Sequence, residues 1–231
     1  MMKSIQNSFL ILLKPLRLFL RVLAWPSSRT AKRENRYRLK DQTCIELGLI
    51  GPQDKQRYLN GFNRLSPRTN INRFHTFKTG FTEKELDYLL NIDNVHHLAI
   101  GAIDCKKRNT GIGLARYICQ KDNPNQAEVA ITVIDEYQGR GLGKLLYQQL
   151  INKAQQNGIT SLRNIIKKDN RAMLHILEQL GAIQISENDQ VYELELQLKR
   201  PDGLADSEAS SDSSQKTSAH RNMTNMAVTA I

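Results

Sequence analysis

The chain has 231 residues, 40% of them hydrophobic, and a formal net charge of +10. This length suits one ordinary domain with appendages. The charge is concentrated at one end: residues 1–40 hold ten Lys or Arg against the single acid Glu34, and the other 191 residues sum to about +1. A main domain so close to neutrality argues against nucleic acid as a partner.

The N-terminal segment, residues 1–45, begins with an apolar stretch that charged residues interrupt. In a helix, Lys14, Arg17 and Arg21 share one face. The uncharged runs are too short to span a bilayer, which needs about 20 residues, and no clear secretory cleavage site follows. We expect residues 8–25 to form an amphipathic helix on an anionic membrane surface. Packing on a partner or on the chain's own domain, and an organellar presequence, are alternatives.

The main domain is expected over residues 46–200, after a charged linker, and the Ser-rich segment 201–231 is expected to be disordered. Hydrophobic periodicity and turn residues predict the elements of this domain. In chain order they are helices over 66–74 and 82–92, a hairpin of strands 97–104 and 112–119, a strand 127–134, a helix from 142 that stops at Asn157 and Gly158, a strand 161–167, a helix 171–180 and a closing hairpin of 182–186 and 191–198. This order predicts an α+β fold, a mixed α/β sandwich.

The three cysteines, Cys44, Cys105 and Cys119, are odd in number and lack metal-ligand spacing. We therefore expect a reducing, cytoplasmic environment, no structural disulfide and no metal site. Buried, inert thiols are the ordinary role for such cysteines.

Residues 138–143, Gln-Gly-Arg-Gly-Leu-Gly, follow a predicted strand and open a predicted helix. A P-loop is excluded, because Leu145 stands where its hydroxyl residue belongs, and the dinucleotide fingerprint fails at its last glycine. Small residues at a helix N-terminus let backbone N–H groups converge on a pyrophosphate, and Arg140 and Lys144 add positive charge. A plain strand-to-helix turn with solvated cations is the alternative.

This loop resembles the acyl-CoA pyrophosphate loop of the GNAT superfamily of N-acetyltransferases, Gln/Arg-x-x-Gly-x-Gly/Ala. The second GNAT signature resembles residues 170–182, NRAMLHILEQLGA, where Asn170 and Gly181 have the family's separation. Residues 61 to about 185, which include the runs RLSPRTNINRF and AEVAITV, resemble the catalytic domain of bacterial protein lysine acetyltransferases. This resemblance implies the GNAT fold, with a central mixed, mostly antiparallel sheet flanked by helices, and acetyl-CoA as co-substrate.

The second signature departs from the family pattern at Met173, Leu177 and Ala182. In many family members a tyrosine at the position of Leu177 is credited with protonating the departing thiolate, which leucine cannot do. The group of protein lysine acetyltransferases also tends to lack this tyrosine. No residue is therefore nominated for that step.

Strand alternation places Val129, Ile131 and Val133 on one face, expected to be core, and Glu128 with two small residues on the other. The family resemblance places the general base at Glu128, although a solvent-facing glutamate is the plainer alternative. Acetyl-CoA is expected to contact Ile131, Thr132, Val133, Gln138, Gly139, Arg140, Gly141, Leu142, Gly143, Lys144 and Asn170. The acceptor is expected to be a protein lysine side chain; a small-molecule amine, or a catalytically silent acetyl-CoA-binding module, are the rivals.

Overall fold

The computed structural model describes residues 35–199, so the predicted helix over 8–25 and the tail 201–231 lie outside the described residues. The elements in chain order are β1 (Arg36–Arg38), β2 (Cys44–Leu49), the 3-10 turn η2 (Pro52–Asp54), α1 (Lys55–Phe62), α2 (Pro67–Phe74), α3 (Glu83–Leu90), β3 (His97–Asp104), β4 (Gly111–Cys119), β5 (Gln126–Val133), η3 (Asp135–Tyr137), α4 (Leu142–Gln156), β6 (Ser161–Lys167), α5 (Arg171–Gln179), β7 (Ile183–Glu187) and β8 (Val191–Gln197). Every element predicted from residue 66 onward is present, within two residues of its predicted bounds.

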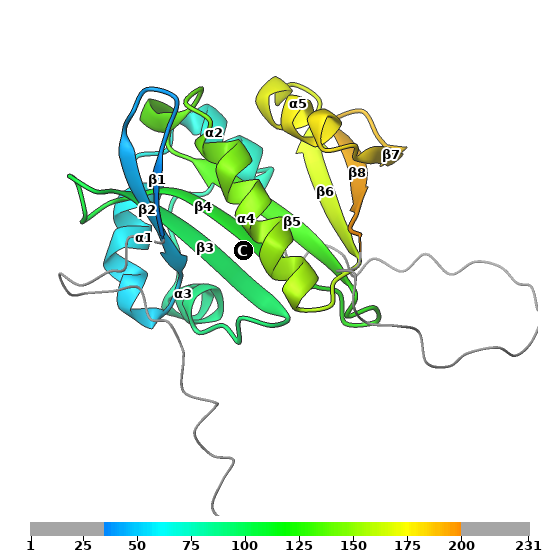
Figure 1. Cartoon of the computed structure of the whole chain (residues 1–231), viewed down its shortest axis with the longest axis horizontal. Helices are drawn as coiled ribbons and strands as arrows, with labels where there is room; N and C mark the ends of the chain where they lie inside the picture. Colours follow the sequence, from blue (N-terminus) through cyan, green and yellow to red (C-terminus); the bar gives the residue numbers. More distant parts are fainter. Residues whose placement is uncertain (1–34, 200–231) are drawn as a thin grey trace, which may run out of the picture.

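The strands form one eight-stranded sheet in the order β1-β2-β3-β4-β5-β6-β8-β7. Its only parallel pair among the described strands is β5 with β6, and the other neighbours are antiparallel. The expected mixed, mostly antiparallel sheet is therefore confirmed. Parallel pairing requires a crossover, and α4 provides it between β5 and β6 (Figure 1).

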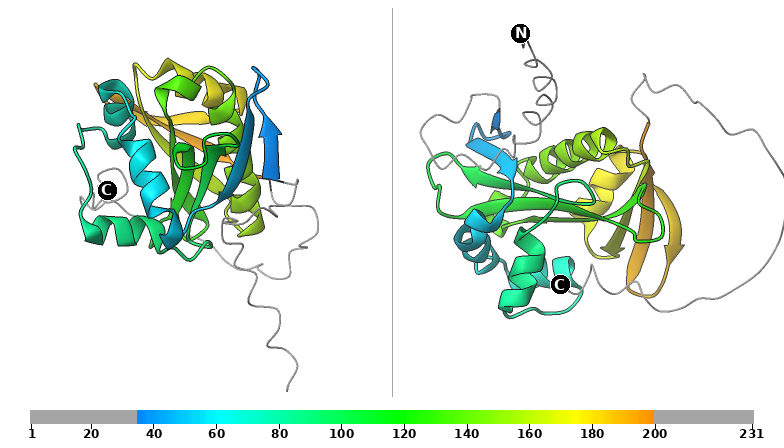
Figure 2. Two further views of the ribbon diagram at one scale, coloured as in Figure 1. Left: turned by 90° about the vertical axis from the view of Figure 1, so that its left-hand side faces the viewer. Right: turned by 90° about the horizontal axis from the view of Figure 1, so that it is seen from below.

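The helices cover both faces of the sheet (Figures 1 and 2). On one face α4 buries the apolar stripe of Leu142, Leu146, Leu150 and Ala154, and it packs against β4 and β5. On the other face α1 contacts β4 and α2 contacts β5. No helix within residues 35–199 is long and apolar enough to cross a membrane.

Local sequence signals fix where the helices begin. The Ser66 hydroxyl caps α2 by accepting from the Thr69 amide at 3.2 Å, with proline at the first helical position. Thr82 and Glu85 form a capping box at the start of α3. Asn170 caps α5, its side chain accepting from the Met173 amide at 3.3 Å.

The sheet begins earlier in the chain than expected, because β1 and the first two residues of β2 lie in the stretch predicted to be a charged linker. β1 has only three residues, two of them arginines, which is too short a run to show the alternation that predicts a strand. Tertiary contacts hold them instead: Arg36 faces Glu46 in the register and forms an ion pair with it at 3.5 Å. The short helix α1 also escaped prediction.

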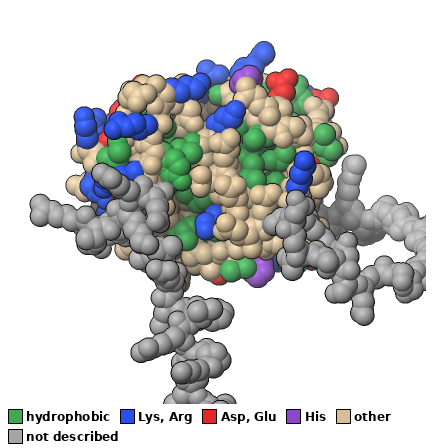
Figure 3. All heavy atoms as spheres, in the orientation of Figure 1, with side chains coloured by type: hydrophobic (Ala, Val, Ile, Leu, Met, Phe, Trp, Pro, Cys, Tyr) green, Lys and Arg blue, Asp and Glu red, His purple; other side chains and the backbone are tan. Residues whose placement is uncertain are grey.

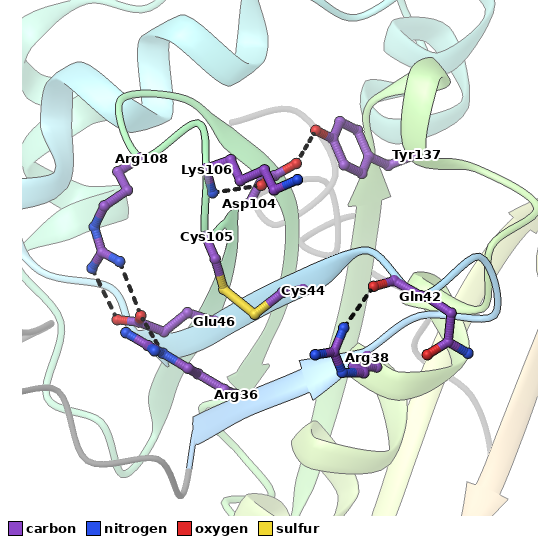
Figure 4. The surroundings of a disulfide bond; sticks show 10 residues. All are labelled: Arg36, Arg38, Gln42, Cys44, Glu46, Asp104, Cys105, Lys106, Arg108 and Tyr137. Atoms are coloured by element: carbon purple, nitrogen blue, oxygen red, sulfur yellow. Dashed lines mark hydrogen bonds and ion pairs between the residues drawn. A yellow bond between two sulfur atoms is a disulfide. The ribbon is translucent and has the colours of Figure 1, made fainter.

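The expectation of no structural disulfide is wrong, because Cys44 is bonded to Cys105. Figure 4 shows the bond joining the start of β2 to the residue after β3. The antiparallel register explains the pairing, because Ile45 faces Asp104. Cys44 precedes Ile45 and Cys105 follows Asp104, so the two cysteines face each other as well. The two cysteines are 61 residues apart in sequence, and no local pattern could have matched them. Cys119 is a free thiol.

Candidate active site

β5 and β6 pair over three residues only and then separate (Figure 1). The pairs are Gln126 with Ser161, Ala127 with Leu162, and Glu128 with Arg163, although β5 continues to Val133. Beyond Glu128 the edge of β5 that faces β6 therefore lacks a partner strand in the described sheet. A strand edge of this kind presents backbone N–H and C=O groups to whatever lies beside it.

Alternation along β5 decides which amides face this gap. The Ile134 amide donates to the Ile112 carbonyl, next to β4, at 3.1 Å. Because N–H groups alternate in direction along a strand, every second amide before Ile134 also points toward β4. The amides of Ile131 and Val133 therefore point toward the gap. The Thr132 amide, expected to be available with the other two, is directed to β4. On the gap side, the Val133 carbonyl accepts from the Gln138 side chain at 2.9 Å.

The side chains of β5 alternate between the two faces of the sheet as expected. Val133 lies on the α4 side, where its Cγ2 would be 3.9 Å from a Cβ added at Gly143, and Val129 and Ile131 follow the same alternation. Thr132 lies on the opposite side, where it lines a cavity beneath α1 and α2. Glu128 and Ala130 share the Thr132 face.

A cavity of about 30 Å³ lies where β5 and β6 separate. It brings together residues from β5, β6, α2 and α5, namely Asn72, Arg73, His75, Glu128, Val129, Ala130, Ile131, Asn164, Ile165, Ile166, Asn170 and Met173. Three of the predicted site residues, Glu128, Ile131 and Asn170, thus line one space. Leu177 does not line it and is fully buried in the core.

The glycine loop leaves the first backbone amides of α4 without a side-chain cap. Gly139 and Gly141 have φ angles of 72° and 89°, which side chains adopt only at a cost. α4 then begins at Leu142, with Gly141 as its N-cap and no side chain capping its first amides. Such amides carry the positive end of the helix dipole and are a ready site for phosphate. Figure 3 shows Lys and Arg side chains along the upper edge of the same face, where α4 begins.

The two cations of the loop have protein partners. Arg140 forms an ion pair with Asp41 at 2.7 Å, and its guanidinium lies 4.9 Å from the centre of the Tyr137 ring. Lys144 donates to the Gln179 side chain at 3.0 Å. A pyrophosphate would therefore meet the backbone cradle directly and these side chains after an exchange of partners.

Nine of the twelve cavity residues were not predicted, and three of these nine come from α2 and its C-cap residue, namely Asn72, Arg73 and His75. Burial lowers the pKa of Arg73, while electrostatic interactions with Tyr58 and Glu128 oppose that change. Burial also lowers the pKa of His75, helped by the nearby charges of Arg73 and Lys167. His75 is therefore neutral near pH 7. In the sequence these residues lie in or next to the run RLSPRTNINRF, which contributes to the family resemblance but does not indicate what any single side chain does.

A hydrogen-bond network ties α2 to the glycine loop. The Asp135 carboxylate accepts from the Ser66 amide at 2.9 Å, from the Ser66 hydroxyl at 2.7 Å and from the Thr69 hydroxyl at 2.8 Å. The Gln138 side chain donates to the Thr69 hydroxyl at 3.1 Å. The helix that carries Arg73 is thus fixed to the loop that opens α4.

Among residues 35–199, no three His, Cys, Asp or Glu side chains gather in a way that could hold a metal ion. The described cavity between β5 and β6 is lined by a glutamate, a histidine and a buried arginine, among other residues.

The described fold thus combines a pair of parallel strands that separate with a glycine-rich turn at a helix N-terminus. The model of the Acetyltransferase (GNAT) family matches residues 67–182, and the chain belongs to this family. The family resemblance and the expected fold are thus confirmed.

Among its relatives, the chain is 34% identical over 144 residues to Acetyltransferase Pat of Mycolicibacterium smegmatis, a match that covers 59% of this chain and 40% of that protein. It is 33% identical over 148 residues to Acetyltransferase PA5475 of Pseudomonas aeruginosa, covering 63% of this chain and 78% of the relative. The crystal structure of the GNAT domain of S. lividans PAT shares the fold, with a TM-score of 0.65 and 22% identity over 71% of this chain and 96% of that one. The match thus spans less than half of the Mycolicibacterium protein.

Proposed function

We propose that the protein transfers the acetyl group of acetyl-CoA to the amine of a protein lysine side chain, with Glu128 as general base. The observation that carries this proposal is the position of Glu128 at the last paired residue before β5 and β6 separate. A thioester in the gap would have a carboxylate beside it on one face of the sheet and the glycine cradle at the far end of the same strand.

In this proposal the loop of residues 138–144 binds the pyrophosphate through its backbone amides. The pantetheine arm runs back along the unpaired edge of β5, past Val133 and Ile131. From Glu128 to Ile134 the strand spans roughly 20 Å, at about 3.3 Å per residue, which is comparable with the length of that arm. The amides of Ile131 and Val133 that face the gap are the donors for the thioester oxygen, and Asn170 contacts the arm from α5.

The acceptor enters as an ammonium, which has a pKa of about 10.4 and no lone pair for attack. Glu128 takes its proton, directly or through one water. The freed amine attacks the thioester carbonyl carbon, and amides directed at the developing oxyanion stabilise the tetrahedral intermediate. The C–N bond forms, the C–S bond breaks, and the electron pair leaves with sulfur as the CoA thiolate. The attacking nitrogen then loses its extra proton to water. We nominate no residue to protonate the thiolate, because Leu177 has no proton to give; the thiolate leaves unprotonated or takes a proton from water.

Support for a protein lysine acceptor comes from the resemblance of residues 61 to about 185 to the catalytic domain of bacterial protein lysine acetyltransferases. A small-molecule amine is the second candidate, and the cavity of about 70 Å³ enclosed by α1, α2 and the sheet favours it. Incubating the purified protein with acetyl-CoA and either a lysine-containing protein pool or a panel of small amines separates the two. Mass spectrometry of acetyl-lysine supports the first, and acetylation of small amines alone would replace it with the second.

Residues 8–25 lie outside the described residues, and we propose that they hold the enzyme at an anionic membrane surface. Sedimentation with phosphatidylserine liposomes, with the full chain and with a chain lacking residues 1–30, tests this. Equal sedimentation of the two chains would contradict it.

A further inference from the structure

Two arginines are buried on the Glu128 face of the sheet. Arg73 of α2 is 7% exposed and Arg116 of β4 is 1% exposed. Arg116 faces Ala130 in the register, one alternation from Glu128, and the two guanidinium groups are close enough for the charge of Arg73 to affect Arg116. Buried charges in proteins are usually paired with an opposite charge.

Neither arginine forms an ion pair with a carboxylate in the described part of the chain. Arg116 is held by the Leu89 carbonyl at 2.8 Å and by His97, and its Nε has no partner among these residues. Arg116 is thus fixed to the protein, although its charge is not neutralised at contact distance.

Arg73 differs from Arg116, since its guanidinium has a ring contact but no hydrogen bond within residues 35–199. It lies 4.8 Å from the centre of the Phe74 ring and interacts electrostatically with Glu128 and Tyr58. A guanidinium carries five N–H donors in a planar fork. A buried arginine whose donors are not used by the protein is suited to a ligand that brings its own acceptors.

Arg73 also joins two cavities. It lines the space between β5 and β6 with Glu128, and it lines the cavity of about 70 Å³ beneath α1 and α2. The second cavity has a mainly apolar wall that includes Phe62, Phe74 and Leu114, and it can hold several water-sized groups. Its acid, Asp54, is already paired with Arg57 at 2.8 Å. Arg57 and Arg73 both line this cavity, and Arg57 is the one paired with Asp54. Arg73 therefore stands between the apolar wall of this cavity and the space that Glu128 lines.

We infer that Arg73 is a specificity-determining residue that binds a carboxylate of the substrate. The carboxylate has two possible sources: the end of a short acyl chain carried by CoA, or an acidic side chain next to the acceptor lysine. A bidentate arginine–carboxylate contact supplies both the missing charge and the missing acceptors. This inference rests on the proposed acyl transfer beside Glu128 and adds to it the chemical class of the preferred substrate.

Two comparisons distinguish the sources. The first uses one lysine peptide with succinyl-CoA or butyryl-CoA, which differ in a terminal carboxylate on a four-carbon acyl group. The second uses acetyl-CoA with a peptide that carries Glu or Gln beside the lysine. Each gives a ratio of kcat/KM values, charged over neutral. We expect a ratio of about 10 to 100 in one of the two, the range typical of a hydrogen-bonded charged contact.

The variants then assign the preference to Arg73. Arg73→Met should bring the ratio to within about threefold of unity, and Arg73→Lys should leave an intermediate value, because an ammonium keeps the charge and loses the fork. Arg68→Met is the matched control, since Arg68 is exposed on the same helix, and it should keep the wild-type ratio. Thermal melting checks that each variant folds, and Arg73→Lys carries the test if Arg73→Met does not.

Ratios near unity in both comparisons for the wild type would overturn the inference, as would an unchanged ratio in the Arg73 variants. Failure of the proposed function looks different, because the wild type would then transfer no acyl group from either CoA ester. In that case calorimetry on the same pairs of ligands gives the ratios as dissociation constants. A preference for the carboxylate ligand that is lost in the Arg73 variants supports the inference, and equal constants contradict it.

Discussion

Glu128 of β5 and Arg163 of β6 are the last facing pair of the two parallel strands. Arg163 forms an ion pair with Glu193 of the neighbouring strand β8. Glu128 instead lines a cavity together with Arg73 and His75, at the end of α2. The strand separation that opens a space for a thioester therefore begins at the residue we propose as the base. One break in pairing creates both the gap and the unpaired amides beside it.

The glycine cradle should depend on positive φ angles at the start of α4. Gly141→Ala should destabilise the fold by about 1–2 kcal/mol, because a residue with a Cβ pays that cost in the left-handed region. It should also weaken the binding of CoA, measured by calorimetry. Gly158→Ala is the control, since Gly158 ends the same helix with a φ of 78° and open space around it. That variant should lose similar stability and retain CoA affinity; equal losses of affinity would argue against the cradle.

The Asp135 network should couple α2 to the loop. Asp135→Asn removes the charge from three hydrogen bonds and should cost about 1 kcal/mol in the free energy of unfolding, with a higher KM for acetyl-CoA. A variant with wild-type kinetics would show that α2 and the loop are positioned independently.

The same carboxylate gives the stability a dependence on pH. Partial burial raises the pKa of Asp135, but hydrogen bonds from Ser66 and Thr69 outweigh that effect and hold the pKa below its ordinary value. The stabilisation is therefore fully present above the unfolded-state pKa of about 3.9 and is lost as the pH falls through the lower folded pKa. Urea denaturation between pH 5 and pH 3 should show a shallower decline for Asp135→Asn than for the wild type. Parallel declines would contradict this assignment.

The disulfide should stabilise the sheet by closing a long loop. Cys44→Ser or Cys105→Ser should each lower the free energy of unfolding by about 2–4 kcal/mol, as should adding dithiothreitol to the wild type. Cys119→Ser is the control, because Cys119 is a free thiol. If dithiothreitol leaves the urea midpoint of the wild type unchanged, the bond does not contribute in solution.

Much of the fold could be predicted from local patterns, because its helices and central strands carry their own periodicity and caps. Three helices begin after residues whose side chains cap them, namely Ser66, Thr82 and Asn170. These starts can be predicted without knowledge of tertiary contacts. β1 is different, since its strand character comes from pairing with β2, and the Cys44–Cys105 bond depends on a register between segments 61 residues apart. Neither leaves a trace in local composition.

The candidate site divides in the same way. The glycine loop could be predicted as a phosphate site from its own residues and position, whereas Glu128 was predicted as the base only through the family resemblance. Arg73 and His75 read as ordinary polar residues of a short helix, and they gain meaning only when α2 is folded over β5. Conversely, the alternation of amides that sets Ile131 apart from Thr132 follows from the pairing of β5 with β4.

The most direct test of the account is the rate of acetyl transfer by Glu128→Gln, which keeps the shape of the side chain and removes its basicity. We predict a fall in kcat/KM for a lysine substrate of roughly 10²- to 10⁴-fold, the usual contribution of a general base, with a dissociation constant for acetyl-CoA within about twofold of the wild type. A variant that binds acetyl-CoA normally and transfers the acetyl group at the wild-type rate would contradict it.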